Sequence, residues 1–559
     1  MKGSFPVTLA EYLRVSVLSL SVISGVERAI TSILNGKVVP APVGQGGSNA
    51  FAFHRDRTTD STTDLAINSH QPLEGPVAWY EAHLCSEQGW NILGGLFPGG
   101  TTVFHGANEH LGWAHTVNYQ DKIDTYQLQT DKAHPGQYLF DNQWLPLEVK
   151  TVKLRVKGIP FAIGRKAYYS KYGPTMVTKT GIFAVRFGAN QDLRGLEQWY
   201  RMNKARSFAE FRQAIAEPAI PGFNIIYADA DTIYFVTNGK IPYRDPAYNW
   251  LGTLPGNTSR TLWTRFRPLA DFPQLTNPRA GYVFNMNNTP FNATAPDENL
   301  HPDQFDATMG FERWNTNRST RFGELMAERV GQQIDYADFK RIKYDLQFPR
   351  DISYPLGPDI SALFALDPAR YAGIREEIET LKTWNRQATA DSRGAALYGI
   401  FHYYMADKTK DTPSPKPPLT PDDCAEGLQL ARMYLLKHFG RTNVTLGEYQ
   451  QHVRGKVETP IWGLPDVLAA INTLPYTNAA GQMGRMHSTQ GESYIMLAKF
   501  PKTGLPVLET VNCFGASARP DSPHYTDQMG LFTQMKTKPM TLDKAAVLRT
   551  AKRTYHPGE

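Results

Sequence analysis

The chain has 559 residues, of which 41% are hydrophobic and 20% are charged. This length exceeds what one ordinary core accommodates, so we expect several domains or one large composite domain. The composition is that of a folded globular protein and excludes a disordered or fibrous chain. The formal net charge of +6 is spread along the sequence without dense runs of Lys and Arg, which argues against a nucleic-acid or membrane-surface partner.

Neither the cysteines nor the apolar N-terminal stretch defines a compartment. Cys85, Cys424 and Cys513 are odd in number and widely spaced, so their spacing predicts no disulfide framework and no zinc site. Residues 13–23 are apolar, but they include Arg14 and are too short to span a bilayer. The same stretch lacks the basic start and the small-residue cleavage site of a secretory signal.

The N-terminal third changes character at residue 48. Residues 8–35 predict a helical segment, because apolar side chains recur at three- and four-residue steps. Residues 36–47 contain two prolines and four glycines, which predict an extended linker. From residue 48 to about 185, short β-type runs separated by polar turns predict strands. Among them, residues 149–156 alternate as a half-buried antiparallel strand should.

Helices and strands are segregated in the remainder of the chain. An apolar stripe predicts a helix over residues 191–216, and two short runs within residues 223–236 predict a pair of strands joined by a turn. Helical patterns dominate from about residue 318 to residue 474, and strand patterns return within residues 493–510. The clearest helical patterns in this part are those of residues 322–330, 369–386 and 424–439. Because regular βαβ alternation is missing, we predict an α+β architecture.

A serine at a new N-terminus can carry its own base. A serine hydroxyl is a poor nucleophile near neutral pH, whereas a free α-amino group, with a reference pKa of about 7.7 to 8.0, can accept its proton. Gly46-Gly47-Ser48-Asn49 suits the cut that frees such a terminus, because two glycines reach backbone conformations closed to other residues. The Ser48 hydroxyl can then attack the Gly47 carbonyl, form an ester and be released by water. Taken alone, Gly-Gly-Ser is also the common composition of a linker turn.

A series of motifs in a fixed order resembles the penicillin acylase family. Ser48-Asn-Ala-Phe-Ala-Phe53, Asn68-Ser-His-Gln-Pro72 and Trp79-Tyr-Glu-Ala-His83 look like the start of that family's β-subunit. The later matches are His105-Gly-Ala-Asn-Glu109, Gly112-Trp-Ala-His-Thr-Val117, Asn224-Ile-Ile-Tyr-Ala-Asp-Ala-Asp231, Asn285-Met-Asn-Asn-Thr-Pro290, Asn317-Arg-Ser-Thr-Arg321 and Ser522-Pro-His-Tyr-Thr-Asp-Gln528. The resemblance covers nearly all of residues 44–540. It is closest to the branch of acyl-homoserine-lactone and aculeacin acylases, because His70 stands where penicillin G enzymes have Gln.

The resemblance implies an α+β fold of the N-terminal-nucleophile (Ntn) hydrolase type, a four-layer αββα sandwich with a helical insertion. Residues 1–35 would be a residual α-subunit helical segment, residues 36–47 a spacer, and residues 48–559 the β-subunit domain, with its helix-rich insertion at about 318–474. The implied chemistry is autocatalytic cleavage between Gly47 and Ser48. Hydrolysis of an N-acyl amide to a carboxylic acid and an amine would follow, through an acyl-enzyme on Ser48.

The resemblance also assigns roles to four further residues. The backbone NH of Val117 and the side chain of Asn287 would bind the oxyanion, and such preorganised donors contribute several kcal/mol in a typical hydrolase. His70 would support the nucleophile, and Arg318 would orient the α-amino group or Asn287. Each residue also has an ordinary interpretation: a surface or core histidine for His70, strand packing for Val117, a turn for Asn287 with Asn288 in its role, and an ion pair for Arg318 with Arg321 in its place.

Asp121, Ile123 and Asp124 fall where many members of the family bind calcium through two carboxylates and a carbonyl. Two acids in a turn are also common as solvated charge. A calcium ion here would be structural, because the serine chemistry needs no cofactor. We therefore expect no catalytic cofactor.

The sequence departs from the family before the nucleophile. Family precursors usually carry a much longer segment there, whereas 47 residues precede Ser48 here, so we expect either a start further upstream or a shortened chain. The family implies a periplasmic or secreted protein, although no signal peptide is visible. The expected partners are a small-molecule N-acyl amide and, after self-cleavage, the protein's own α-segment in a heterodimer. No nucleic-acid or membrane partner is expected.

Three functions stay open at this point. The first is a self-processing amidohydrolase that acts on N-acyl homoserine lactones or related long-chain amides. The second is the same enzyme class with another acyl preference, such as penicillins or acylated cyclic peptides. The third is a truncated, catalytically inactive family member that serves as a non-enzymatic scaffold.

Overall fold

The computed structural model describes residues 7–23, 25–36, 47–156, 158–188, 192–352, 359–410, 412 and 416–556. Most of the predicted linker, including Gly46, lies outside the described residues. The predicted N-terminal helical segment consists of two helices, α1 (Leu9–Ile23) and α2 (Val26–Leu34). None of the helices in the described part of the chain has both the length and the apolar character that a bilayer crossing requires.

Two sheets form the centre of the molecule. The first sheet has nine strands, in which β18, β1, β2 and β22 are consecutive neighbours. Its strands are β1 (Gly47–Phe53), β2 (Thr63–Pro72), β18 (Tyr282–Asn285), β19 (Gln450–Arg454), β20 (Val457–Pro460), β21 (Ile471–Tyr476), β22 (Arg485–Phe500), β23 (Val507–Asn512) and β24 (Lys538–Met540). Strands from both ends of the chain therefore pair in one sheet.

The second sheet has seven strands in the order β17-β15-β14-β6-β5-β4-β3, all antiparallel. Its strands are β3 (Tyr80–Ser86), β4 (Trp90–Leu96), β5 (His105–Asn108), β6 (Leu111–Thr116), β14 (Gly222–Asp229), β15 (Ile233–Gly239) and β17 (Gln274–Thr276). The predicted strand pair within residues 223–236 is the hairpin of β14 and β15.

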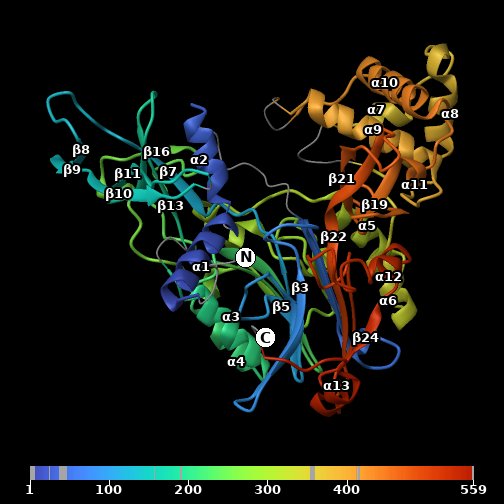
Figure 1. Ribbon diagram of the computed structural model, residues 1–559, viewed down its shortest axis with the longest axis horizontal. Coiled ribbons are helices and arrows are strands. Elements are labelled where there is room, and N and C mark those ends of the chain that lie inside the picture. Colours follow the sequence, from blue (N-terminus) through green and yellow to red (C-terminus); the bar gives the residue numbers. More distant parts are fainter. Residues whose placement is uncertain are drawn as a thin grey trace.

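The two sheets pack face to face, with helices on the outer face of each (Figure 1). Helices α3 (Gly195–Lys204) and α4 (Phe208–Ala216) lie against the second sheet, where Phe211 packs 5.8 Å from Trp113. Helices α5 (Asn317–Ala327), α6 (Tyr336–Lys343) and α12 (Met529–Thr533) lie against the first sheet. The expected four-layer αββα sandwich, and with it the α+β fold class, is confirmed.

Strand β1 shows how the sandwich divides its side chains. Ala50 and Ala52 point between the two sheets and join the apolar core there. Phe51 and Phe53 point the other way, toward the helices, and the Phe51 ring lies 5.3 Å from that of Phe322 in α5. Small residues on the inner face let the sheets approach, and large aromatic residues anchor the helices to the outer face. By this alternation, Ser48 belongs to the inner face.

A third sheet lies beside the sandwich, on the left of Figure 1, where α2 packs on it. Its strands are β7 (Ile123–Leu128), β10 (Glu148–Leu154), β11 (Ile163–Ser170), β12 (Gly173–Val177), β13 (Ile182–Phe187) and β16 (Thr253–Pro255), and a separate hairpin is formed by β8 (Gln137–Phe140) and β9 (Gln143–Pro146). The antiparallel strand predicted at residues 149–156 is present as β10, but the prediction that it is half-buried is wrong. Every residue of β10 is exposed, because both faces of the strand meet solvent. The strand also lies at the edge of this sheet.

The helices between residues 361 and 449 surround a core of their own, at the upper right of Figure 1. They are α7 (Ser361–Phe364), α8 (Arg375–Thr383), α9 (Arg393–Lys408), α10 (Pro421–Phe439) and α11 (Leu446–Tyr449), and α13 (Lys544–Thr550) follows near the C-terminus. Two predictions need correction. Helical structure does not continue to residue 474, because β19, β20 and β21 follow α11 and extend the first sheet. The helix predicted over 191–216 is two helices, since Ser207 caps a new helix by accepting a hydrogen bond from the Glu210 amide.

Candidate active site

Ser48 is a buried residue at the start of β1, at one end of the sandwich. Its side chain is 3% exposed. The Ser48 Oγ donates a hydrogen bond to the Gly47 carbonyl oxygen at 2.6 Å, and the Ser48 backbone NH donates to Asn287 Oδ1 at 2.7 Å. The hydroxyl is thus directed at the peptide group that precedes it. A side chain on Gly47 would crowd the site, because an added Cβ would lie 3.2 Å from His70 Nδ1.

Asn287 connects the serine to the second sheet. It follows β18 with a φ of +62°, in the left-handed region that asparagine tolerates better than most residues. Its Nδ2 donates to the Val117 carbonyl at 2.9 Å, while its Oδ1 faces Ser48. The alternative residue Asn288 bonds instead to the backbone of its own loop, where its Oδ1 accepts from the Met286 amide at 2.8 Å. Of the two asparagines, the structure therefore places Asn287 beside the serine.

Arg318 joins the same cluster from the first turn of α5. Its guanidinium donates to the Ser48 carbonyl at 2.8 Å and to Asn287 Oδ1 at 3.0 Å. Its Nε donates to Asp466 at 2.9 Å, so a carboxylate balances the buried charge. The alternative Arg321 pairs with Asp345 and Glu324 and takes no part in this cluster. Ser48, Asn287, Arg318 and Val117 thus form one connected set of hydrogen bonds.

His70 lies beside Gly47 rather than in contact with the serine hydroxyl. It pairs with Gly47 across β1 and β2, and its Nε2 accepts a hydrogen bond from Asn68 Nδ2 at 3.1 Å. Burial lowers the pKa of His70 to about 4, against an opposing effect of Glu492, so the ring is neutral near pH 7. A β-bulge in β22 after Glu492 brings His70 and Glu492 opposite each other, with His70 Nε2 3.8 Å from Glu492 Oε1.

Sequence reasoning missed the buried pair behind His70. Glu492 accepts from Asn68 Nδ2 at 2.6 Å and forms an ion pair with Lys343 at the end of α6. Burial alone would raise the pKa of Glu492, but the Lys343 ammonium and the neighbouring His70 ring lower it overall. Glu492 therefore stays a carboxylate that fixes Asn68 and, through it, the His70 ring. No motif marks Lys343 or Glu492 in the sequence, because only the packing of α6 on the first sheet brings them together.

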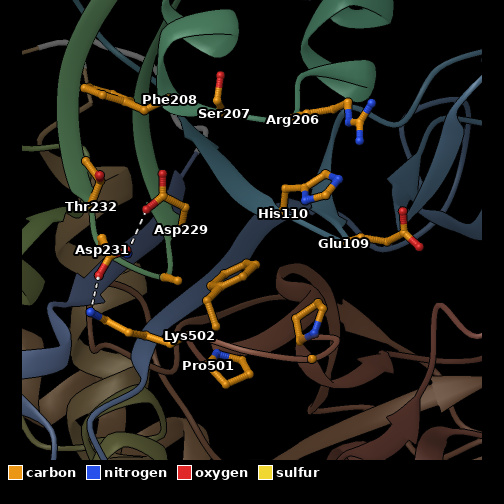
Figure 2. Close-up of a pocket in the computed structure, with 14 residues that line it drawn as sticks. Glu109, His110, Arg206, Ser207, Phe208, Asp229, Asp231, Thr232, Pro501 and Lys502 are labelled. Carbon is orange, nitrogen blue, oxygen red and sulfur yellow. Dashed lines mark hydrogen bonds and ion pairs between the residues drawn. The ribbon is translucent and has the colours of Figure 1, made fainter.

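The pocket drawn in Figure 2 has a volume of about 370 Å³. It lies at the end of β1 that is opposite to Ser48. Its wall includes Asp231, whose carbonyl oxygen is 3.1 Å from His54 Nε2, just after the last residue of β1. The other labelled residues that line it in Figure 2 are Glu109, His110, Arg206, Ser207, Phe208, Asp229, Thr232, Pro501 and Lys502. None of the residues that the sequence assigns to catalysis contributes to it. At about 3.3 Å per residue, it is roughly 20 Å from Ser48.

The residues proposed for calcium surround an arginine. The Arg244 guanidinium lies 3.0 Å from Asp121 Oδ2 and 2.9 Å from Asp124 Oδ1, and its side chain is fully buried. Burial raises the pKa of Asp124 to about 7, and Arg244 opposes this shift. With Ile123 entering β7 between the two acids, the donor set contains a fixed cation where a metal would sit. With Arg244 in this position, these residues do not fit calcium.

The sequence is similar to those of known proteins. It matches the penicillin amidase family over residues 6–549. The chain belongs to the penicillin amidase family. An acyl-homoserine lactone acylase PvdQ of Pseudomonas putida is 25% identical over 539 residues, covering 87% of this chain and 67% of that protein. A penicillin G acylase of Escherichia coli is 25% identical over 280 residues, covering 47% of this chain and 32% of that protein.

The fold of this chain is similar to that of a solved member of the family. A thermostable penicillin G acylase from Alcaligenes faecalis superimposes with a TM-score of 0.65 at 17% sequence identity, covering 91% of this chain and 99% of that chain. Identity this low establishes the shared fold alone. Together, the family match and the named relatives support an acylase, an enzyme that hydrolyses acyl amides.

The buried neutral His70 predicts a pH dependence of stability. Its pKa is about 4 in the folded protein and about 6.5 when unfolded, so between these values the unfolded chain binds more protons. The stabilisation is complete above pH 6.5 and is lost as the pH falls toward 4, which amounts to about 2 to 3 kcal/mol between pH 7.5 and 4.5. His70→Gln is expected to remove this part of the pH dependence of the free energy of unfolding, which is measured by urea unfolding at a series of pH values. The exposed His110→Gln serves as control, and an unchanged pH dependence in His70→Gln contradicts the prediction.

Arg244 predicts that stability does not depend on calcium. Chelation with EDTA is expected to leave the melting temperature of the wild type unchanged, since Arg244 already balances both carboxylates. Arg244→Met leaves two buried acids without their cation and is expected to lower the free energy of unfolding, measured with urea, by about 3 to 5 kcal/mol. A drop in the wild-type melting temperature on chelation, reversed by added calcium, would instead establish the metal site.

Proposed function

We propose that this penicillin amidase is a self-processing amidohydrolase whose nucleophile is Ser48. The observation that carries the proposal is the pair of hydrogen bonds made by Ser48. Its Oγ is directed at the Gly47 carbonyl, and its backbone nitrogen, the future α-amino group, is held by Asn287 Oδ1. One residue thus presents both an attacking oxygen and an anchored nitrogen.

Self-cleavage uses the first of these contacts. The Ser48 Oγ attacks the Gly47 carbonyl carbon, the C–N bond breaks as a C–O bond forms, and the hydroxyl proton passes to the leaving nitrogen. Water then hydrolyses the ester, which leaves a carboxylate on Gly47 and a free hydroxyl on Ser48. The segment that ends at Gly47 is proposed to stay bound as the smaller chain of a heterodimer.

Turnover uses the freed amine as the base. A free α-amino group has a reference pKa of about 7.7 to 8.0, and the nearby Arg318 cation disfavours its protonated form. The neutral amine accepts the Ser48 proton as Oγ attacks the acyl carbon of the substrate, and it then gives that proton to the departing amine. Water releases the carboxylic acid from the acyl-enzyme by the same relay.

The oxyanion of each step is proposed to lie between Val117 and Asn287. These residues come from the two facing sheets and are already in contact, with Asn287 Nδ2 2.9 Å from the Val117 carbonyl. The Val117 backbone NH and the Asn287 Nδ2 are the two donors. In a buried site, such donors stabilise developing charge far more than they would in water. His70 is proposed to support the backbone of β1 at Gly47 in its neutral form.

The substrate is proposed to be an N-acyl homoserine lactone or a related acyl amide. Several relatives at 24 to 25% identity carry the name acyl-homoserine lactone acylase, and the resemblance at His70 supports the same choice. Penicillins and acylated cyclic peptides stay as alternative substrates of the same chemistry. The family further suggests a periplasmic or secreted protein. A non-enzymatic scaffold is the alternative from a different class.

Ser48→Ala is expected to abolish both cleavage and turnover, because it removes the only atom proposed to attack either carbonyl. Intact-mass spectrometry should show a wild-type fragment that begins at Ser48 and a single uncut chain for Ser48→Ala. A matched control is Ser488→Ala, a buried strand serine that bonds to His452 instead. Hydrolytic activity from a wild-type chain that is uncut at position 48 would refute the proposal, and an uncut inactive wild type would favour the scaffold.

Asn287→Ala is expected to lower kcat on the order of 100-fold or more, since one oxyanion donor is lost. The rate is measured by detection of the product amine with a series of acyl-homoserine lactones and with penicillin G, which also ranks the substrates. The control is Asn203→Ala, a buried asparagine that bonds to Val103 away from the site. Normal turnover in Asn287→Ala would remove this residue from the mechanism.

A further inference from the structure

The two proposed oxyanion donors belong to different sheets. Val117 follows β6 of the second sheet, and Asn287 follows β18 of the first. Because a donor displaced by about 1 Å loses much of its effect, something must fix the distance between the two segments. Apolar packing between sheets is poorly suited to this task, because it has no preferred direction.

Asn285, two residues before Asn287, bridges the two sheets next to these donors. It is fully buried at the end of β18, and its Oδ1 accepts hydrogen bonds from Thr116 Oγ1 at 2.5 Å and from Asn224 Nδ2 at 3.1 Å, both in the second sheet. The same oxygen accepts from the Asn287 backbone NH at 2.9 Å. One carboxamide oxygen therefore ties β6, β14 and the Asn287 backbone together.

The second half of the bridge is Asn224, near the start of β14 and opposite Thr116 at the end of β6. Its Nδ2 donates to Asn285 and lies 3.4 Å from the Val117 carbonyl oxygen, and its Oδ1 accepts from Thr237 at 2.6 Å. Asn224 is fully buried, as is Thr237. The chain of contacts thus runs from Val117 through Asn224 and Asn285 to Asn287.

The bridge also holds Asn287 in an unfavourable conformation. A non-glycine residue at positive φ persists only where its surroundings over-determine it, and Asn287 has a φ of +62°. Its NH is fixed by Asn285 Oδ1, while Asn285 Nδ2 donates to the carbonyl of the next residue, Asn288, at 3.2 Å. The Asn285 side chain thereby binds both the NH of Asn287 and the carbonyl of Asn288. Strand pairing alone does not require these two contacts.

We propose that Asn285 and Asn224 are positioning residues that set the separation of the Val117 and Asn287 donors across the two sheets. The inference rests on the proposed function, because it assigns them an effect on the oxyanion rather than on the fold alone. Neither residue touches the nucleophile. Their effect is therefore expected in kcat, where the oxyanion develops, and much less in KM.

The test compares Asn285→Ala and Asn224→Ala with Asn203→Ala in the full chain. Asn203 in α3 is equally buried and makes two side-chain hydrogen bonds to the Val103 backbone, so its loss removes similar interactions away from the site. We expect kcat to fall about 10- to 100-fold in both bridge variants with KM changed less than about threefold, by analogy with the loss of one oxyanion donor. Asn203→Ala is expected to lower the melting temperature to a similar degree but to keep the wild-type kcat.

Two results overturn the inference. The first is a kcat in Asn285→Ala and Asn224→Ala that stays within twofold of the wild type, as in Asn203→Ala. If the alanine variants fail to fold, Thr116→Val decides, because it preserves shape and removes only the 2.5 Å hydrogen bond to Asn285. A fall in kcat with unchanged melting temperature supports the bridge, and an unchanged kcat overturns it.

Failure of the proposed function gives a different pattern. In that case the wild type itself shows no cleavage at Ser48 and no turnover of acyl-homoserine lactones or penicillin G. A wild type that is cleaved and active, with bridge variants of normal kcat, refutes the positioning role alone.

Discussion

The hydrogen bond between the Ser48 backbone NH and the Asn287 carboxamide is the interaction on which the site depends. At 2.7 Å it fixes the first residues of β1 against the loop that follows β18, its neighbour in the first sheet. Arg318 then binds both partners from α5. Three segments separated by up to 270 residues in sequence therefore meet at one amide group.

Buried charges around this amide are matched one by one. Arg318 is balanced by Asp466, and Glu492 is balanced by Lys343. Because an unpaired charge in a poorly solvated interior carries a large desolvation penalty, each of these groups depends on its partner. The consequence for the site is a fixed cation beside Ser48 and a neutral imidazole beside Gly47. Charge pairing in the interior is also seen at Arg244, whose guanidinium lies between the carboxylates of Asp121 and Asp124.

The interior of the sandwich changes from apolar to polar along the strands. In the middle of β1, Ala50 and Ala52 meet the apolar side chains of the second sheet. Toward the site, Asn285 and Asn224 fill the space between the sheets, where Asn224 Nδ2 donates a hydrogen bond to Asn285 Oδ1. The apolar part supplies most of the stabilising burial, whereas the polar part gives the contact between the sheets a defined geometry. The site lies where this directional contact is present.

The sequence by itself determined the family and the α+β class and pointed to the segments that meet around Ser48, because ordered motifs and local periodicity depend on neighbours in the chain. It named Asn287 and Arg318 but left Asn288 and Arg321 as alternatives, since nearby candidates differ in the direction that their side chains take in the fold. It also missed Glu492 and Lys343, which no motif joins, and it misjudged β10, whose alternating pattern suits an exposed edge as well as a half-buried strand. Only the tertiary structure decided these points, because burial, charge pairing and contact between sheets arise from residues that are distant in sequence.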